Sequence, residues 1–586
     1  MVRVVPDVPA IHRRFDYSVP PALSGRIRVG SRVRVDLHGR RVGAWVVEAD
    51  IPPTPGVTTK PLAASSGAGP PPSVVALAEW ASWRWAGPLS SFLGTASPER
   101  IVDERVPVTV GDSGPPDSPG GGSVALVDEA LSGGDVPAVI RLAPALDATL
   151  VVLELVHRVG PAGVLVLAPS HARAAQVAAR LRTGGVPVAL LPDRWAEAST
   201  GTFVVVGTRA AAWAPVPRLA AAVVLDAHDE AYREERSPTW SAVDVTVERA
   251  RRDGAPVLLV SPCPPVTLTE GARLVTTSRA VERRGWPLVE VVDRTGDDPR
   301  TGLFSERMAR AVHGVLDRPE GTVVCILNRI GRIRLLACGR CGSLARCSRC
   351  GGAVAQDEAA GGLVCRRCGE VRPAVCAECD ATRLKSLRVG VTRAAEELTA
   401  LTGTTAVEVS AASGAGTDLG ARLVVGTEAA LHRVAQAALV VFLDIDQHLL
   451  APRFGAGEEA LALLARAAHL VGPRAAAGRL LVQTRLPGHE TLQAAVHADP
   501  ALLAGPERAL RQLLGLPPFG AVTLLRGPGA GTFAEELRCN PAVQVASLEP
   551  ERWMVTAPDH RVMADALAAV PRPAARLRVE VDATAV

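Results

Sequence analysis

Hydrophobic and polar positions change their period along the chain, and these changes divide it into regions. Residues 1–50 alternate apolar and polar side chains in short runs separated by Gly and Pro, which is typical of a small β-domain. Residues 51–72 are rich in Pro, Gly, Ser and Thr and predict a linker inside an N-terminal domain that extends over 1–106. A second linker, again rich in Gly and Pro, is expected over 107–123.

From residue 124 the pattern changes to continuous apolar runs, such as Val164–Ala168 and Val223–Leu225, between segments of helical period. Such runs are typical of parallel strands that helices cover on both faces. We therefore predict a multidomain α/β protein with two parallel-sheet lobes. The expected domains are a first lobe over 124–290, the start of a second lobe over 291–337, a cysteine-rich insertion over 338–379, the rest of the second lobe over 380–500 and a small α+β C-terminal domain over 501–586.

The composition is that of a folded chain, because 48% of the 586 residues are hydrophobic and 21% are charged. No apolar stretch reaches the ~18–20 residues that a bilayer span requires. The N-terminus lacks a basic flank followed by an apolar core, so a secretory signal is not expected. These observations predict a cytoplasmic protein.

Positive charge is concentrated in two regions, although the formal net charge is only +4. Residues 1–50 contain nine Arg against five Asp and Glu, a surplus of four. Residues 326–379 contain nine Arg against four acidic residues, a surplus of five, so the rest of the chain sums to −5. Two basic regions favour contact with a polyanion. The alternative is an arginine-rich surface that is only solvated.

Eight of the eleven cysteines form four CxxC pairs inside 338–379. The pairs are Cys338/Cys341, Cys347/Cys350, Cys365/Cys368 and Cys376/Cys379. A CxxC turn brings two thiolates within ~2.3 Å of one metal ion, and two such pairs complete a tetrahedral shell. The sequence therefore predicts two structural zinc ions; disulfides and iron–sulfur clusters are the alternatives that the setting and the paired spacing disfavour. Spacing leaves sequential and nested pairings equally open.

Several further motifs follow one another in an order that runs over nearly the whole chain. They are Phe15–Tyr17, Gly207–Arg209, His228–Asp229 with Tyr232, Asn328–Gly331 just before the cysteine insertion, Gly426–Glu428, Leu443–Asp446 and Gly515–Phe519. This order resembles that of the bacterial primosomal protein N′, or replication restart protein PriA, family of helicase superfamily 2. The eight-cysteine insertion in the same place is the most specific part of the resemblance, which implies RecA-like lobes and a zinc-binding insertion.

The resemblance also implies that the first domain binds the 3′ end of a DNA strand. Phe15, Asp16 and Tyr17 match the positions that stack on the terminal base and lie near the free 3′-hydroxyl. In the alternative interpretation, the two aromatic side chains fill the core of the β-domain. Arg40 and Arg41 are expected to contact phosphates, and such contacts position a strand without reading its sequence.

The ATP-binding loop of this family is degenerate here. A P-loop requires G-x-x-x-x-G-K-[ST], and neither of the two lysines, Lys60 and Lys385, follows Gly. The equivalent segment, Arg141–Thr149, has no Gly and places Asp147 where the lysine belongs. We expect this carboxylate to repel a triphosphate.

Two further parts of the ATPase machinery depart from the family pattern. The acidic motif is reduced to Asp226, Ala227 and His228, so at least one carboxylate for Mg²⁺ is missing or displaced. The positions of the two arginine fingers fall on Leu470 and Pro473. Three separate changes together indicate a degenerate PriA-type helicase that lacks the Walker A lysine, and we do not expect it to be an active enzyme.

The resulting hypothesis is a nucleoid-associated replication restart protein that binds stalled or abandoned forks without ATP-driven unwinding. Its expected partners are forked and single-stranded DNA, primosome proteins, the machinery that loads the replicative helicase, and single-stranded DNA-binding protein. An active ATP-dependent 3′–5′ DNA helicase is the first alternative, and a zinc-ribbon nucleic-acid-binding scaffold is the second.

Overall fold

The computed structural model describes residues 1–584 except 9–10, 12, 53–58, 103–116, 119, 135, 298–301, 328–334, 358–361, 366–367, 387–390, 411–412 and 414–418. The motif Asn328–Gly331, part of the linker 51–72 and most of the linker 107–123 therefore lie outside the described residues. Contacts divide the chain into two units. The first consists of Met1–Arg141, Asp147–Thr276 and Arg511–Ala583, and the second of Leu142–Leu146, Thr277–Leu510 and Thr584–Val586.

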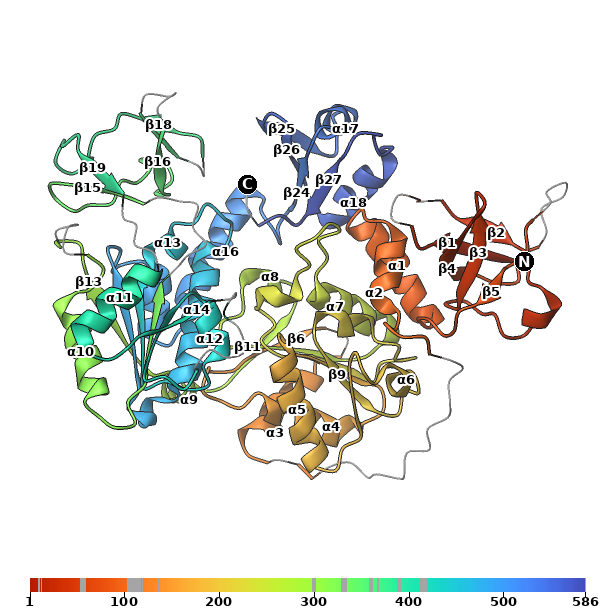
Figure 1. Cartoon of the computed structure of the whole chain (residues 1–586), viewed down its shortest axis with the longest axis horizontal. Helices are drawn as coiled ribbons and strands as arrows, with labels where there is room; N and C mark the ends of the chain where they lie inside the picture. Colours follow the sequence, from red (N-terminus) through yellow and green to blue (C-terminus); the bar gives the residue numbers. More distant parts are fainter. Residues whose placement is uncertain are drawn as a thin grey trace. The chain divides into compact units, whose positions relative to one another are not determined.

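The N-terminal part of the first unit is an antiparallel five-stranded sheet followed by two helices (Figure 1). The sheet has the order β2-β1-β4-β3-β5, and its inward-facing residues form a small apolar core with Leu62. The elements are β1 (Val2–Pro6), β2 (Phe15–Tyr17), β3 (Arg32–Leu37), β4 (Arg40–Glu48), β5 (Ala64–Ser65), α1 (Pro72–Arg84) and α2 (Leu89–Ala96).

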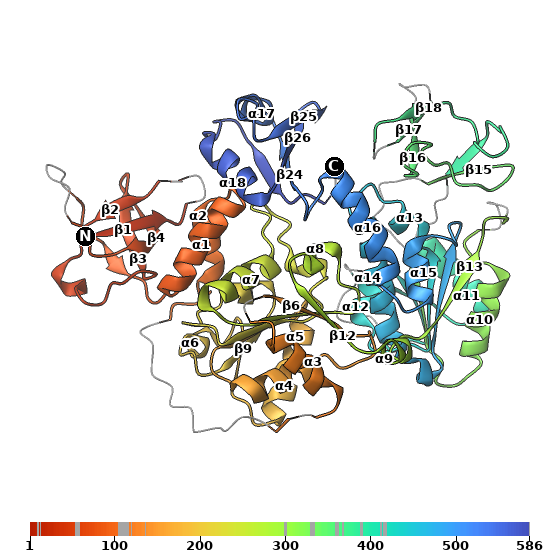
Figure 2. The same ribbon diagram turned by 180° about the vertical axis from the view of Figure 1, so that it is seen from behind.

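The first lobe is built on a seven-stranded parallel sheet of order β12-β6-β11-β10-β7-β9-β8. Helices α3, α4 and α5 cover one face and α7 covers the other (Figures 1 and 2). The elements are α3 (Gly122–Leu131), β6 (Ala138–Arg141), α4 (Thr149–Val159), β7 (Val164–Leu167), α5 (His171–Thr183), β8 (Val188–Leu190), α6 (Trp195–Ala198), β9 (Val204–Gly207), β10 (Ala221–Val224), α7 (Ala242–Asp253), β11 (Val257–Ser261), α8 (Val266–Thr269) and β12 (Arg273–Thr276).

Local signals in the sequence set the limits of these helices. The Ser241 hydroxyl accepts a hydrogen bond from the amide of Asp244 at the start of α7, and α7 ends where Gly254 takes a left-handed conformation. Ser170 caps α5 in the same way. Strands β7, β9 and β10 are buried at every position, as the continuous apolar runs predict.

The C-terminal part of the first unit is an antiparallel sheet of order β25-β26-β24-β27 with two helices. The elements are β24 (Ala521–Arg526), α17 (Ala530–Leu537), β25 (Gln544–Glu549), β26 (Arg552–Ala557), α18 (His560–Ala569) and β27 (Arg578–Val581). Directly after β27, the Asp582 carboxylate accepts a hydrogen bond from buried Arg84 of α1 at 2.8 Å. This ion pair ties the end of the sheet to the N-terminal helices of the same unit.

The second unit contains the second lobe, a six-stranded parallel sheet of order β13-β23-β22-β14-β21-β20. Helices α10 and α11 pack on one face, and α14 and α15 on the other (Figures 1 and 2). The elements are α9 (Arg279–Arg284), β13 (Leu288–Asp293), α10 (Glu306–Leu316), β14 (Val323–Leu327), α11 (Val391–Thr402), β20 (Val407–Val409), β21 (Leu423–Gly426), α12 (Ala429–Arg433), β22 (Leu439–Asp444), α13 (Asp446–Leu449), α14 (Ala456–Val471), β23 (Arg479–Thr484) and α15 (Glu490–Val496). Helix α16 (Ala501–Leu514) follows, and its residues from Arg511 onward belong to the first unit.

The cysteine-rich insertion leaves the second lobe after β14 and forms two small antiparallel sheets. Its strands are β15 (Leu336–Cys338), β16 (Val354–Asp357), β17 (Gly362–Cys365), β18 (Val371–Arg372) and β19 (Leu384–Ser386). The two parallel-sheet lobes, the insertion, the N-terminal β-domain and the α+β C-terminal part confirm the fold class expected from the sequence. A search of the described residues found no helix long and apolar enough to span a bilayer.

Candidate functional site

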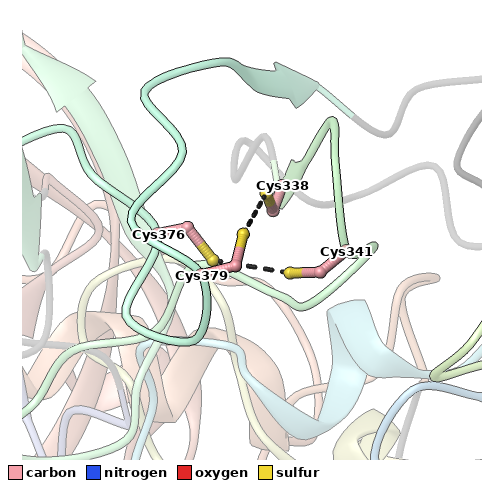
Figure 3. A group of neighbouring side chains, drawn as sticks. All are labelled: Cys338, Cys341, Cys376 and Cys379. Carbon is pink, nitrogen blue, oxygen red and sulfur yellow. Dashed lines mark hydrogen bonds between the residues drawn. The ribbon is translucent and has the colours of Figure 1, made fainter.

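The eight CxxC cysteines gather into two groups of four, and the pairing is nested. Cys338 and Cys341 meet Cys376 and Cys379 in an outer cluster, where Sγ of Cys338 lies 3.6 Å from Sγ of Cys379 (Figure 3). In the inner cluster, Cys347 and Cys350 meet Cys365 and Cys368, and Sγ of Cys350 lies 3.5 Å from Sγ of Cys365. The structure therefore selects one of the two pairings that spacing left open.

The sulfur geometry fits a tetrahedral metal site. Four thiolates at ~2.3 Å from one ion would lie about 3.8 Å from one another. Within each cluster all four sulfur atoms lie within 4.8 Å of one another, and the shortest separations are 3.5 to 3.6 Å. Each cluster could hold one metal ion. A closed set of four ligands leaves no position for a substrate, so such an ion would stabilise the insertion.

All four CxxC turns share one backbone arrangement. The residue after the second cysteine has a positive φ and donates its amide hydrogen to the carbonyl oxygen of the first cysteine at 2.9 to 3.1 Å. Three turns use glycine at this position, namely Gly342, Gly351 and Gly369, and the fourth uses Asp380 at φ 59°. Glycine adopts this conformation without steric cost, whereas a side chain with Cβ does not.

Backbone amides also point at the sulfur atoms. The amide of Arg340 donates to Sγ of Cys338 at 3.3 Å, and that of Arg349 donates to Sγ of Cys347 at 3.4 Å. Burial raises the pKa of Cys350 to about 12, whereas hydrogen bonds with Ser343, first with its side chain and then with its amide, lower the pKa of Cys341 to about 6. Such bonds favour the thiolate, which is the form that binds a metal.

The outer cluster is attached to the second lobe through a contact between Gly342 and Arg485, called the socket below, which sequence analysis did not find. Gly342 carries its carbonyl 2.9 Å from Nη1 of Arg485, which donates the hydrogen bond. A Cβ atom on Gly342 would lie 2.9 Å from the carbonyl oxygen of Asp297 and 3.1 Å from the Arg485 guanidinium. Only glycine therefore fits this contact. The sequence signal that could have indicated this contact is the charged Arg485 directly after β23.

A buried carboxylate, Asp446, and a partly buried one, Asp444, lie behind this socket. Asp446 accepts a hydrogen bond from the amide of Arg485 at 2.8 Å and another from the Thr484 hydroxyl. Asp444 accepts one from the side-chain amide of Gln447 at 2.8 Å. Burial, together with repulsion from Asp444, raises the pKa of Asp446 to about 7. The motif Leu443–Asp446 thus supports the residue that holds the first CxxC turn.

The three residues predicted for the 3′-end site differ in exposure. The Asp16 carboxylate is partly exposed and forms a two-point ion pair with Arg3, whose Nε donates at 2.8 Å. Phe15 is half-buried at the edge of the apolar core. Tyr17 is 4% exposed and its hydroxyl donates to the carbonyl of Asp36 at 2.9 Å. Tyr17 therefore helps to build the β-domain, and the DNA-binding role of all three residues stays a prediction.

Arg40 and Arg41 lie at the β3–β4 hairpin. The turn consists of His38 and Gly39, both at positive φ, which is the geometry of tight hairpins. Both arginine side chains are exposed on β4. Their position suits contact with a phosphate backbone, and that contact also stays a prediction.

In Arg141–Thr149, the segment expected at the place of the P-loop, several backbone amides donate hydrogen bonds to acceptors of the protein. The amide of Thr149 donates to the Asp147 carboxylate at 2.9 Å, and the amide of Leu146 donates to the carbonyl of Ala143 at 2.9 Å. Pro144 has no amide hydrogen, and its carbonyl lies 2.7 Å from Nδ1 of His469. A phosphate cradle requires several amides that point outward together, and these amides already have acceptors.

One more amide of this segment is bonded within the second unit. The amide of Ala145 donates to the carbonyl of Gly285 at 3.1 Å. A Cβ atom on Gly285 would lie 2.5 Å from Cβ of Ala143, so the two stretches of backbone are in close contact. Arg180 lies 3.6 Å from Asp147, a loose ion pair between two partly exposed side chains.

Asp226 and His228 follow β10 in the first lobe. Asp226 has a positive φ of 49°, and its carbonyl accepts a hydrogen bond from the amide of Asp229. Nδ1 of His228 lies 3.0 Å from the Ser261 hydroxyl. Ala227 is 5% exposed and brings no carboxylate to the position between them. The stretch from Asp226 to His228 therefore forms a turn in which Asp226 is the one carboxylate.

The segment expected at the place of the arginine fingers lies in and after α14. Leu470 is 3% exposed and is part of the buried face of this helix. Pro473 precedes a short turn, and Arg474 next to it is exposed. Neither finger position carries a cation.

Comparison with known proteins gives a consistent result. Residues 3–98 match the 3′DNA-binding domain (3′BD) of PriA proteins. The chain is 30% identical to the probable replication restart protein PriA of Mycobacterium bovis, over 90% of this chain and 86% of the relative. It is 26% identical to the replication restart protein PriA of Bacillus subtilis over 55% of this chain and 43% of that protein.

Among solved structures, RecG bound to a three-way DNA junction is similar over 69% of this chain and 47% of that chain, at 12% identity and a TM-score of 0.37. A similarity this low does not define a function. The match of residues 3–98 to a 3′DNA-binding domain, together with the mycobacterial relative, defines a DNA-binding protein of replication. The similarity to the mycobacterial relative shows that the chain belongs to the replication restart protein PriA family.

Proposed function

We propose that this PriA-family protein binds stalled or abandoned replication forks and promotes reloading of the replicative helicase without ATP-driven unwinding. The N-terminal β-domain would hold a 3′ strand end through Phe15 and Asp16, with Arg40 and Arg41 on the phosphates. Zinc would occupy both cysteine clusters and hold the insertion as a surface for primosome proteins, the helicase-loading machinery and single-stranded DNA-binding protein.

The proposed absence of ATP-driven unwinding is supported by the hydrogen bonds that backbone amides of Arg141–Thr149 already form. The amides of Ala145, Leu146 and Thr149 donate to acceptors of the protein, and an anionic carboxylate stands at the start of α4. An oxyanion gains most from a helix N-terminus whose amides are free and whose nearby charges are positive. Nucleotide binding would have to displace the Asp147 side chain and bring a triphosphate next to it.

The test combines hydrolysis and binding on the same purified chain. Phosphate release from ATP is measured with and without forked DNA, beside the Bacillus subtilis relative as a reference. Binding is measured by fluorescence anisotropy on a fork with a 3′-hydroxyl leading-strand end, on the same fork with a 3′-phosphate, and on plain duplex. We expect no DNA-stimulated hydrolysis, and tighter binding to the 3′-hydroxyl fork than to the other two.

Two results would replace this proposal with an alternative. DNA-stimulated turnover that disappears in Asp226→Asn, with strand separation, would show an active helicase. Equal affinity for all three DNAs would favour a zinc-ribbon scaffold without recognition of strand ends. The exposed Asp193→Asn is the matched control for Asp226→Asn, because it removes one carboxylate from the same lobe outside the acidic motif.

A further inference from the structure

The N-terminal β-domain contains a recess that none of the predicted DNA-binding residues lines. It lies between the loop that precedes β3 and the segment around β5, and its volume is about 300 Å³. Arg26 and Arg28 contribute from the first stretch, Ser65 and Ser66 from the second, and Ile101 stands beside them. Phe15–Tyr17 form β2, which occupies the opposite end of the strand order from β5.

The floor of the recess is backbone that is fixed by close packing. A Cβ atom on Gly30 would lie 1.8 Å from the carbonyl oxygen of Pro70, and one on Gly69 would lie 2.1 Å from the carbonyl oxygen of Gly30. The amide of Gly30 donates to the carbonyl of Val46 at 2.7 Å, and that of Arg32 donates to the carbonyl of Gly67 at 3.1 Å. The recess is therefore formed before any ligand arrives.

The side chains around this floor are suited to an anion. Arg28 and Arg26 are exposed, and the amide of Arg28 donates to the Ser31 hydroxyl at 3.0 Å, which holds this loop in place. Ser65 and Ser66 line the same space from the other side. Among the described residues that line the recess there is no Asp or Glu. Guanidinium groups bind phosphate oxygens with paired hydrogen bonds, and hydroxyl groups add further donors.

The size and the rim indicate which anion fits. A volume of about 300 Å³ is at the small end of ligand sites and suits a phosphate with its sugar better than a whole nucleotide chain. Ile101 is 71% exposed at the rim and offers an apolar surface to a sugar or a base. We propose that this recess binds one phosphodiester of the DNA strand, at a second contact point separate from the 3′-end residues. This inference rests on the proposed binding of strand ends by the same domain.

The experiment removes the two guanidinium charges of the recess and measures the decrease in DNA affinity. This decrease is compared with the one caused by removing two guanidinium charges elsewhere in the domain. The variant Arg26→Gln/Arg28→Gln is compared with the control Arg13→Gln/Arg34→Gln, whose exposed side chains lie in the same domain outside the recess. Both are titrated with the 3′-hydroxyl fork at several salt concentrations. We expect binding of the recess variant to weaken ~5- to 20-fold at low salt, with the salt slope reduced by about 1–2, and the control to change less than ~3-fold.

A second arm locates the phosphate. Forks carry a single uncharged methylphosphonate at successive positions from the 3′ end, and one position should weaken the wild type but not the recess variant. Equal losses in the recess variant and the control, or no such position, would overturn the phosphodiester site. Binding of a nucleoside monophosphate to the recess that leaves fork affinity unchanged would also overturn it, because the occupant would then be a free nucleotide and not the DNA strand.

The preference for a 3′-hydroxyl strand end is evaluated separately from the affinity that depends on the recess. The wild type must prefer the 3′-hydroxyl fork over the 3′-phosphate fork if the proposed function holds. The recess variant should bind more weakly while it keeps this preference. Loss of the preference in the wild type counts against the proposed function, whereas unchanged affinity of the recess variant counts against the recess alone.

Discussion

The cysteine insertion and the segment Arg141–Thr149 differ in how completely they keep the pattern of the PriA family. The insertion has all eight ligands, and the structure brings them into two compact clusters. The other segment has no glycine and no lysine, and its amides at Ala145, Leu146 and Thr149 donate to acceptors of the protein. We therefore propose that this protein has kept the first motif and lost the second.

The difference shows what each kind of site requires. A Cys₄ site depends on ligands and turns within one short stretch of chain, and its ion stabilises that stretch directly. Nucleotide hydrolysis depends on parts that are far apart in the sequence, so the loss of one part removes the use of the others. Ala227 and Leu470 stand where the resemblance leads us to expect a carboxylate and an arginine.

The largest effect is expected from the loss of one ligand. Cys365→Ser removes a buried thiolate of the inner cluster, and structural zinc binding amounts to roughly 10–16 kcal/mol in small domains. We expect the metal content to fall from two ions per chain to one, and the insertion to become sensitive to protease. Mass spectrometry of the native protein measures the first effect. Cys539→Ser, an exposed cysteine outside the clusters, should retain both ions.

A smaller effect is expected from Asp446→Asn, and it depends on pH. The folded pKa of about 7 lies above the ordinary value near 4, so between pH 4 and 7 the folded state keeps a proton that the unfolded state releases. The free energy of local unfolding therefore falls as pH rises through this window. Asparagine accepts the same amide hydrogen without charge, so we expect the variant to be about 1–3 kcal/mol more stable than the wild type at pH 8.

Hydrogen exchange of the β22 and β23 amides, corrected for intrinsic rates, measures this stability at pH 5 and pH 8. The wild type should lose protection between the two pH values, and Asp446→Asn should lose less. The exposed Glu320→Gln serves as the control and should behave as the wild type does. Equal pH dependence in Asp446→Asn and the control would contradict the raised pKa.

A still smaller effect is expected at the one CxxC turn that lacks glycine. Asp380→Gly removes a Cβ atom from a residue at φ 59° and should strengthen the outer site by up to about 1 kcal/mol. Gly351→Ala at the corresponding position of the inner cluster should weaken that site by a similar amount. Competition with a zinc-binding dye compares the two variants. Opposite signs are the expected result, and a weaker outer site in Asp380→Gly would contradict it.

The smallest effect is expected where a lysine is restored. Asp147→Lys/Ala148→Thr recreates the last two residues of a P-loop, but the amide of Ala145 stays bonded to Gly285 and Pro144 still offers no donor. ATP hydrolysis on forked DNA should stay within ~3-fold of the parent chain. A rise of more than ~100-fold would show that the lysine and the hydroxyl group were the only missing parts.

The sequence was informative wherever one local pattern decides the outcome. Continuous apolar runs predicted the parallel strands, and CxxC spacing predicted the metal ligands. Strand order and the nested cysteine pairing could not be predicted, because both depend on contacts between distant residues. The Arg485–Gly342 socket and the Arg26–Arg28 recess were missed for the same reason, since each is assembled from segments that carry no motif of their own.

Nesting has a consequence for how the insertion is assembled. The inner sulfur pairs are 15 and 21 residues apart in sequence, and the outer pairs are 35 and 41 apart. Closing a shorter loop costs less conformational entropy, and once the inner loop is tied, the remaining chain between the outer cysteines is effectively shortened. Chains made under zinc starvation should therefore bind metal at the inner cluster first and leave the outer cluster without an ion. The inner part of the insertion would then be folded while its two ends, near Cys338 and Cys379, are still loose.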